Sequence, residues 1–180
     1  MPTRHQIRRN KVGHVANSAE VNATADHTFA YISDYRNIEK YMLGLERFEP
    51  TGTQTRGVGA EFTSTLDIGP MKLDLHLSVL EWVNDSRITL RCNAKKMEAT
   101  TCMQLDSLRA ESTQLSVTCD YTVGSGLTAK AIDVALLAFS KAAIRYVEKH
   151  LREQIEDTYT MRAQHRSMPP LPPKPADSTR

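Results

Sequence analysis

Cysteine is scarce in this chain of 180 residues. The three cysteines, Cys92, Cys102 and Cys119, include no Cys-x-x-Cys pair. An odd number of cysteines without close spacing does not predict the disulfide framework of a small secreted domain. A reducing compartment is therefore the simpler interpretation.

Long hydrophobic runs are also absent. The longest, residues 134–139, is far shorter than the roughly 20 residues that a membrane-spanning helix needs. The N-terminus is basic but has no apolar segment of the kind found in secretory signals. We therefore expect a cytoplasmic protein with no integral membrane segment, and a transient contact between the basic N-terminus and anionic lipid stays open.

The positive charge is unevenly distributed. Residues 1–11 and 162–180 together hold eight of the 23 basic groups but only one of the 21 acidic groups, so the middle of the chain has a net charge of −5. A nucleic-acid-binding domain needs a basic face on its folded part. No nucleic-acid partner is expected.

A long amphipathic helix is predicted from Thr128 to Thr158. Its apolar residues recur at steps of three or four and so fall on one stripe. The stripe comprises Ile132, Leu136, Phe139, Ala143, Val147, Leu151 and Ile155. Charged residues, among them Asp133, Glu148 and Arg152, occupy much of the remaining surface. At about 1.5 Å per residue the helix would span roughly 45 Å, and only a series of upstream strands could offer a surface that broad.

Alternation of apolar and polar residues predicts those strands. Residues 73–79 alternate four apolar side chains with Asp74, His76 and Ser78, as a half-buried antiparallel strand does. Further strands are predicted near residues 12–22, 45–53, 61–68, 88–92, 101–105 and 115–123, and two short helices near residues 24–33 and 38–42.

These elements predict a single α+β domain. A curved antiparallel sheet of about seven strands would be covered by the long C-terminal helix, with the two short helices after the first strand. We expect a flexible basic arm at residues 1–11, the domain at 12–161 and a disordered Pro-rich tail at 162–180. Within the tail, Pro169-x-x-Pro172-x-Lys174 matches a proline-rich ligand pattern, so an interaction protein working through both tails is one alternative.

Three stretches carry a resemblance to a known family. They are residues 21–34 (VNATADHTFAYISD), 57–62 (GVGAEF) and 79–82 (VLEW). In this chain order they resemble the START-like (SRPBCC, helix-grip) superfamily, and more narrowly the polyketide cyclase/dehydrase and lipid-transport family. The resemblance covers roughly residues 12–158. It implies a hydrophobic cavity between the sheet and the long helix that binds lipids, polyketides or other apolar molecules.

The predicted inward faces give the candidate ligand-binding residues. They either fill a solid core or line the cavity, and the small, polar and methionine side chains among them favour a cavity. The candidates are Tyr35, Tyr41, Met42, Phe62, Ser64, Leu66, Leu75, Leu77, Leu90, Cys92, Met103, Val117, Cys119, Tyr121, Leu136, Phe139, Ser140, Ala143 and Val147.

Catalytic groups are harder to find. Acid–base catalysis needs a titratable group in the pocket, yet strand alternation directs Asp74, His76 and Asp120 outward. Tyr35, Tyr121 and His150 remain as candidates for proton transfer. We therefore favour a carrier or sensor of a hydrophobic small molecule over the alternative, a polyketide cyclase or dehydratase acting in the same cavity. The residue patterns indicate no metal site and no cofactor, and they leave the oligomeric state open.

Overall fold

The structure is a computed structural model, and it describes residues 11–167. The elements follow the order β1 (Lys11–Val21), α1 (Ala25–Ile32), the 3-10 turn η1 (Tyr35–Asn37), α2 (Ile38–Tyr41), β2 (Leu45–Pro50), β3 (Glu61–Asp67), β4 (Lys72–Val83), β5 (Arg87–Ala94), β6 (Met97–Arg109), β7 (Ser112–Val123) and α3 (Leu127–Ser167).

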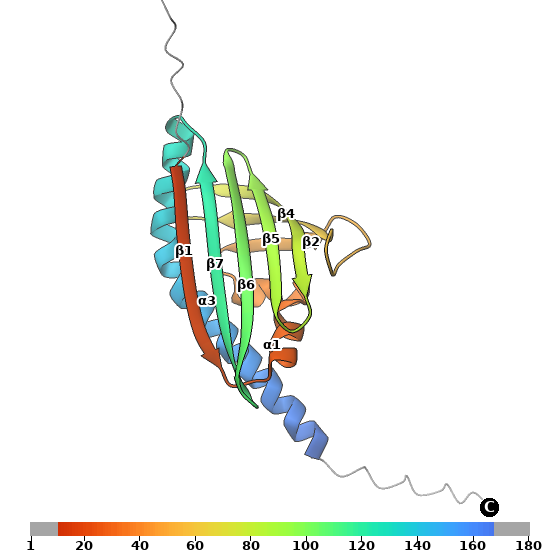
Figure 1. The fold of residues 1–180 in the computed structure, drawn as a ribbon. Coiled ribbons are helices and arrows are strands. Elements are labelled where there is room, and N and C mark those ends of the chain that lie inside the picture. Colours follow the sequence, from red (N-terminus) through yellow and green to blue (C-terminus); the bar gives the residue numbers. More distant parts are fainter. Residues whose placement is uncertain (1–10, 168–180) are drawn as a thin grey trace, which may run out of the picture.

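All seven strands form one antiparallel sheet in the order β1-β7-β6-β5-β4-β3-β2. Strands β2 to β7 pair with their neighbours in sequence, while β1 pairs along its whole length with β7. The sheet is curved, and α3 lies against one face beside β1, with its later turns passing α1 (Figure 1). The predicted α+β class and the grip of a curved sheet on a long helix are confirmed.

Strand alternation places the core as the sequence predicts. On β4, Leu73, Leu75 and Leu77 are buried while Asp74 and His76 are exposed. A hydrophobic cluster around β3 and β4 fills one end of the space under the sheet, and a second cluster joins α1 to α3 at the other end. Burial of these apolar faces is the main force that holds α3 to the sheet.

The long helix α3 differs from its prediction at both ends. It begins at Leu127 and continues to Ser167 rather than ending near Thr158. No glycine or proline interrupts the sequence between Thr158 and Ser167, so nothing in the sequence ends the helix before the last described residue. Residues 162–167, assigned from the sequence to the tail, are therefore helical. The basic residues 1–10 and the proline-rich motif lie outside the described residues.

A buried polar contact holds α1 to α3. His27 of α1 is buried, and its Nε2 lies 3.0 Å from the Thr158 hydroxyl oxygen. The His27 ring also meets Tyr159 edge-on, with ring centroids 5.1 Å apart. Burial is the main reason why the pKa of His27 lies below its ordinary value of 6.5.

Acidification is therefore expected to weaken the packing of α1 on α3. As the pH falls below about 6.5, the unfolded chain binds a proton at His27 before the folded chain does, so the free energy of unfolding falls until the lowered folded pKa is passed. His27→Gln cannot titrate, and its urea midpoint should therefore fall less steeply than that of the wild type as the pH is lowered below 6.5. Equal slopes for His27→Gln and the wild type would contradict this assignment.

Candidate functional site

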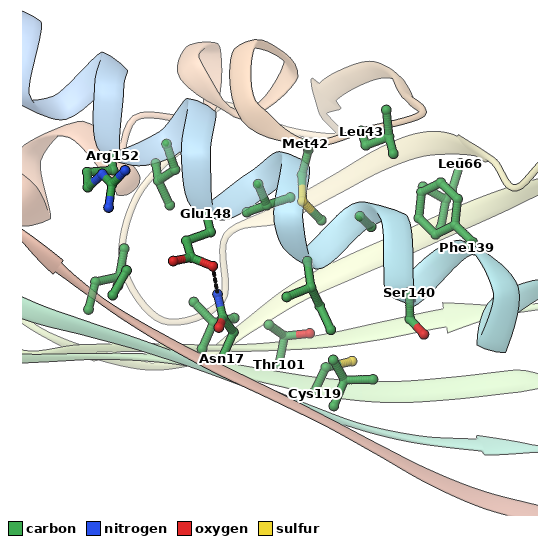
Figure 2. A pocket seen from close by; sticks show the side chains of 18 of the residues that line it. Asn17, Met42, Leu43, Leu66, Thr101, Cys119, Phe139, Ser140, Glu148 and Arg152 are labelled. Atoms are coloured by element: carbon green, nitrogen blue, oxygen red, sulfur yellow. Dashed lines mark hydrogen bonds between the residues drawn. The ribbon is translucent and has the colours of Figure 1, made fainter.

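A cavity of about 230 Å³ lies between α3 and the strands β1, β6 and β7. Met42 and Leu43, in the connection after α2, close part of its rim. Its wall is formed by Val15, Asn17, Ala19, Val21, Met42, Leu43, Leu66, Thr101, Leu115, Val117, Cys119, Tyr121, Leu136, Phe139, Ser140, Ala143, Ile144, Val147, Glu148, Leu151 and Arg152. Apolar side chains dominate this wall, and Figure 2 shows how the polar ones lie among them.

Ten of the candidate residues line this cavity. They are Met42, Leu66, Val117, Cys119, Tyr121, Leu136, Phe139, Ser140, Ala143 and Val147. Those on strands and on α3 line the cavity for the same reason. Each lies on a face that strand alternation or helical spacing directs toward the space under the sheet.

The remaining candidates lie elsewhere under the sheet. Tyr35, Phe62, Leu90 and Met103 line a second hollow of only about 30 Å³, next to the β3–β4 part of the core. Tyr41, Ser64, Leu75, Leu77 and Cys92 are buried in the core and belong to the wall of neither hollow. At this end of the molecule the inward residues therefore pack against one another.

The three candidates for proton transfer lie in three different surroundings. Tyr121 lines the cavity, and its ring lies so close to Gly13 that a Cβ there would fall 2.1 Å from the ring. Tyr35 packs near Phe62, with ring centroids 5.7 Å apart. The His150 ring stacks on the Tyr146 ring of the same helix, and its Nδ1 lies 2.9 Å from the Tyr146 carbonyl oxygen. Of the three, only Tyr121 is in the cavity wall.

One end of the cavity is polar, a feature that the helical pattern did not indicate. Glu148 extends from α3 toward β1, where its Oε2 accepts a hydrogen bond of 3.4 Å from the Asn17 side-chain amide (Figure 2). Arg152, one turn further along α3, lies at the same end and is exposed. The helical pattern predicts both charges on the polar surface of α3; this is correct for Arg152, which is exposed, but not for Glu148, which is half-buried in the cavity wall. Asp133, assigned to the surface for the same reason, is buried.

The position of β1 explains this difference from the prediction. β1 runs alongside α3 and contacts it, so side chains that flank the apolar stripe on this side face a strand instead of solvent. Glu156 behaves in the same way, because its Oε1 accepts hydrogen bonds of 2.9 Å from the backbone and side-chain amides of Asn22. Alternation along β1, with Val15, Asn17 and Ala19 at every second position, was the available signal for this wall.

The opposite end of the cavity has no charged side chain. The Phe139 ring, Leu66 and the hydroxyl-bearing Ser140 lie there (Figure 2). Gly44 adopts a positive φ of 71°, and a Cβ at this position would lie 3.2 Å from the Phe139 ring and 2.4 Å from the Asp67 carbonyl oxygen. Only glycine lets the connection after α2 approach this closely, so the backbone itself braces Phe139.

Two thiols face the interior. Cys119 of β7 lines the cavity, and burial raises its pKa more than the hydrogen bond with Thr101 lowers it. Burial also raises the pKa of Cys92 to about 11. Both thiols are therefore protonated at neutral pH and are poor nucleophiles. Among residues 11–167, no group of three or more His, Cys, Asp or Glu side chains is placed to hold a metal ion.

Solved structures with the same fold come from several organisms. The Zhui aromatase/cyclase from Streptomyces sp. R1128 is similar with a TM-score of 0.65 and 17% identity, covering 81% of this chain and 96% of that one. A START superfamily protein from Mycobacterium smegmatis gives a TM-score of 0.64 and 14% identity, with coverages of 81% and 98%. Truncated norcoclaurine synthase from Thalictrum flavum gives 0.61 and 13%, with coverages of 84% and 97%. The TM-scores show a shared START-like fold, and identities this low show nothing about activity.

The family is shown by the sequence itself. The family model described as polyketide cyclase/dehydrase and lipid transport matches residues 12–156. The chain therefore belongs to the polyketide cyclase/dehydrase and lipid transport family. Comparison with curated proteins gives no match. In the described part of the chain, no helix is both long enough and apolar enough to cross a membrane.

Proposed function

We propose that this protein binds a hydrophobic small molecule, a lipid or a polyketide-like compound, in the cavity between α3 and the sheet, and that it acts as a carrier or sensor. The observation that carries the proposal is the cavity of about 230 Å³ with a largely apolar wall. Ligand sites in proteins are concave and mostly apolar, with a few placed polar groups. Membership of a family whose description includes lipid transport supports the same role.

Ligand binding is tested directly on the full chain. Native mass spectrometry of the purified protein should detect a bound apolar molecule that organic extraction removes. After extraction, the neutral fluorescent probe N-phenyl-1-naphthylamine should bind with a saturable rise in fluorescence. Absence of both a co-purified molecule and saturable probe binding would overturn the proposal.

Thiol protection locates the bound probe. Cys119 lies in the cavity wall, whereas Cys102 follows Thr101 on β6 and so faces the opposite side of the sheet. We expect iodoacetamide at pH 7.5 to modify Cys102 at least about tenfold faster than Cys119, because the half-buried Cys119 thiol faces the cavity and its pKa is raised by desolvation. Bound N-phenyl-1-naphthylamine should slow the modification of Cys119 further and leave Cys102 unchanged, as followed by peptide mass mapping. Equal protection of both thiols would place the probe elsewhere.

A cyclase or dehydratase acting on an apolar substrate is the second candidate function. The observation that favours it is the Glu148 carboxylate in the cavity wall, since acid–base catalysis requires a titratable group within reach of the substrate. The family description includes cyclases and dehydrases, and Tyr121 is a further proton-transfer candidate in the same wall. If the protein turns over a polyketide-like substrate, Glu148→Gln or Tyr121→Phe should lower kcat by about 100-fold or more. Unchanged kcat in both variants would remove these two residues as catalytic groups.

A further inference from the structure

The geometry points to a ligand that carries a hydrogen-bond donor, a hydroxyl or an amine, bound to the Glu148 carboxylate, with its apolar body directed toward Phe139. This inference rests on the proposed function, because it specifies the ligand of the same cavity. It starts from the polarity of the wall. The charged side chains Glu148 and Arg152 lie at one end, while Phe139 and Leu66 lie at the other (Figure 2).

Glu148 has unused capacity to accept hydrogen bonds from a ligand. The side chain is half-buried and reaches from α3 toward the β1 wall. An ionised carboxylate offers about four lone-pair sites, and the bond from Asn17, 3.4 Å long, uses one of them weakly. A donor on a bound molecule could therefore reach the carboxylate without displacing Asn17.

Covering this carboxylate without supplying a donor is unfavourable. A purely apolar ligand at this end of the cavity would exclude water from Glu148 and give no hydrogen bond in return. A ligand carboxylate would place a second negative charge beside it. Arg152 compensates weakly for that repulsion, because its side chain is exposed and solvent and salt screen its charge. The wall thus selects against both fatty-acid anions and plain hydrocarbons.

The apolar end fixes the orientation of the ligand. Phe139 and Leu66 lie there together with Ser140, whose neutral hydroxyl donates a hydrogen bond to the Leu137 carbonyl oxygen. A dry apolar cavity of roughly 150 Å³ takes up benzene, so the 230 Å³ cavity accommodates a larger body, on the scale of two or three aromatic rings or a short alkyl chain. The ligand class is therefore a compact amphipathic molecule with a donating head.

Three probes of the same shape test the head group on the full chain. Naphthalene, 2-naphthol and 2-naphthoate share one ring system but present no head, a hydroxyl donor and a carboxylate, respectively. Competition against N-phenyl-1-naphthylamine at pH 7 ranks their affinities. We expect 2-naphthol to bind at least about tenfold more tightly than either of the others, because hydrogen bonds to charged groups are strong.

Variants of Glu148 separate this inference from a general apolar preference. Glu148→Leu should remove the advantage of 2-naphthol over naphthalene while keeping naphthalene bound, because naphthalene has no donor that the carboxylate could accept from. Glu148→Gln removes the like charge and should raise the affinity for 2-naphthoate several-fold. Glu153→Gln, at an exposed position on α3 outside the cavity wall, is the matched control and should behave as the wild type.

Each other outcome has a distinct meaning. If N-phenyl-1-naphthylamine binds but the three naphthyl probes bind equally well with and without Glu148, the inference fails and the proposed function stands. If 2-naphthoate binds most tightly and Arg152→Gln abolishes that preference, the head group is an anion and the inference is overturned. If no probe binds at all, the proposed function fails, and the inference, which depends on it, fails as well.

Discussion

Replacing Ala143 by tryptophan is expected to weaken ligand binding strongly while the protein stays folded. Ala143 lies on α3 in the middle of the cavity wall, and its small side chain leaves space open. An indole group at this position would occupy much of the 230 Å³ that a ligand needs. Overcrowding costs about 1–3 kcal/mol and about 1.4 kcal/mol corresponds to a tenfold change in affinity, so N-phenyl-1-naphthylamine should bind about 5- to 150-fold more weakly.

Ala142 provides the matched control for that experiment. It is the preceding residue on α3, but it is exposed and is not part of the cavity wall. Ala142→Trp should therefore bind the probe as the wild type does. The circular dichroism spectra and urea midpoints of both variants should show that each is folded. Equal loss of binding in both variants, or in neither, would mean that the probe does not occupy this cavity.

Ile155→Ala is expected to lower the free energy of unfolding by about 2–5 kcal/mol, as large-to-small substitutions in well-packed cores do. Ile155 is 0% exposed and belongs to the cluster that joins α3 to α1. Removing most of its side chain loses buried apolar area and leaves a cavity beneath α1. The urea midpoint should fall at an unchanged m-value.

Leu137→Ala is the control for Ile155→Ala. Leu137 is an aliphatic residue on the same helix but is 55% exposed, and alanine is at least as good a helix former as leucine. Its effect on the free energy of unfolding should stay within about 0.5 kcal/mol. A large loss of stability for Leu137→Ala would mean that the N-terminal half of α3 is buried in a contact that the monomer does not contain.

The architecture was accessible from the sequence because its signals are local and periodic. Residues alternate on β4, where Leu73, Leu75 and Leu77 are buried and Asp74 and His76 are exposed. This alternation predicts one buried sheet face. The apolar stripe of α3 predicts a helix lying on that face. These patterns depend only on neighbours in the chain and on the twofold and 3.6-fold repeats of strands and helices.

The polar end of the cavity was not accessible in the same way. Helical spacing places Glu148 beside the apolar stripe, but it cannot tell whether that flank faces water or a strand. The answer depends on where β1 runs alongside α3, which is set by long-range pairing between β1 and β7. Likewise, the inward residues Leu75 and Leu77 cannot be assigned to a cavity or to a solid core from alternation alone, and the structure places them in the core.

The division of α3 into two stretches has a consequence for how this protein can change. Phe139, Ala143 and Val147 line the cavity, whereas Ile155 anchors the helix in the core with α1, and Leu151 between them takes part in both. The stability of the fold and the specificity for a ligand therefore depend mainly on different turns of α3. Substitutions can accumulate in the cavity turns and redirect the protein to new molecules, while the anchoring turns keep the scaffold intact.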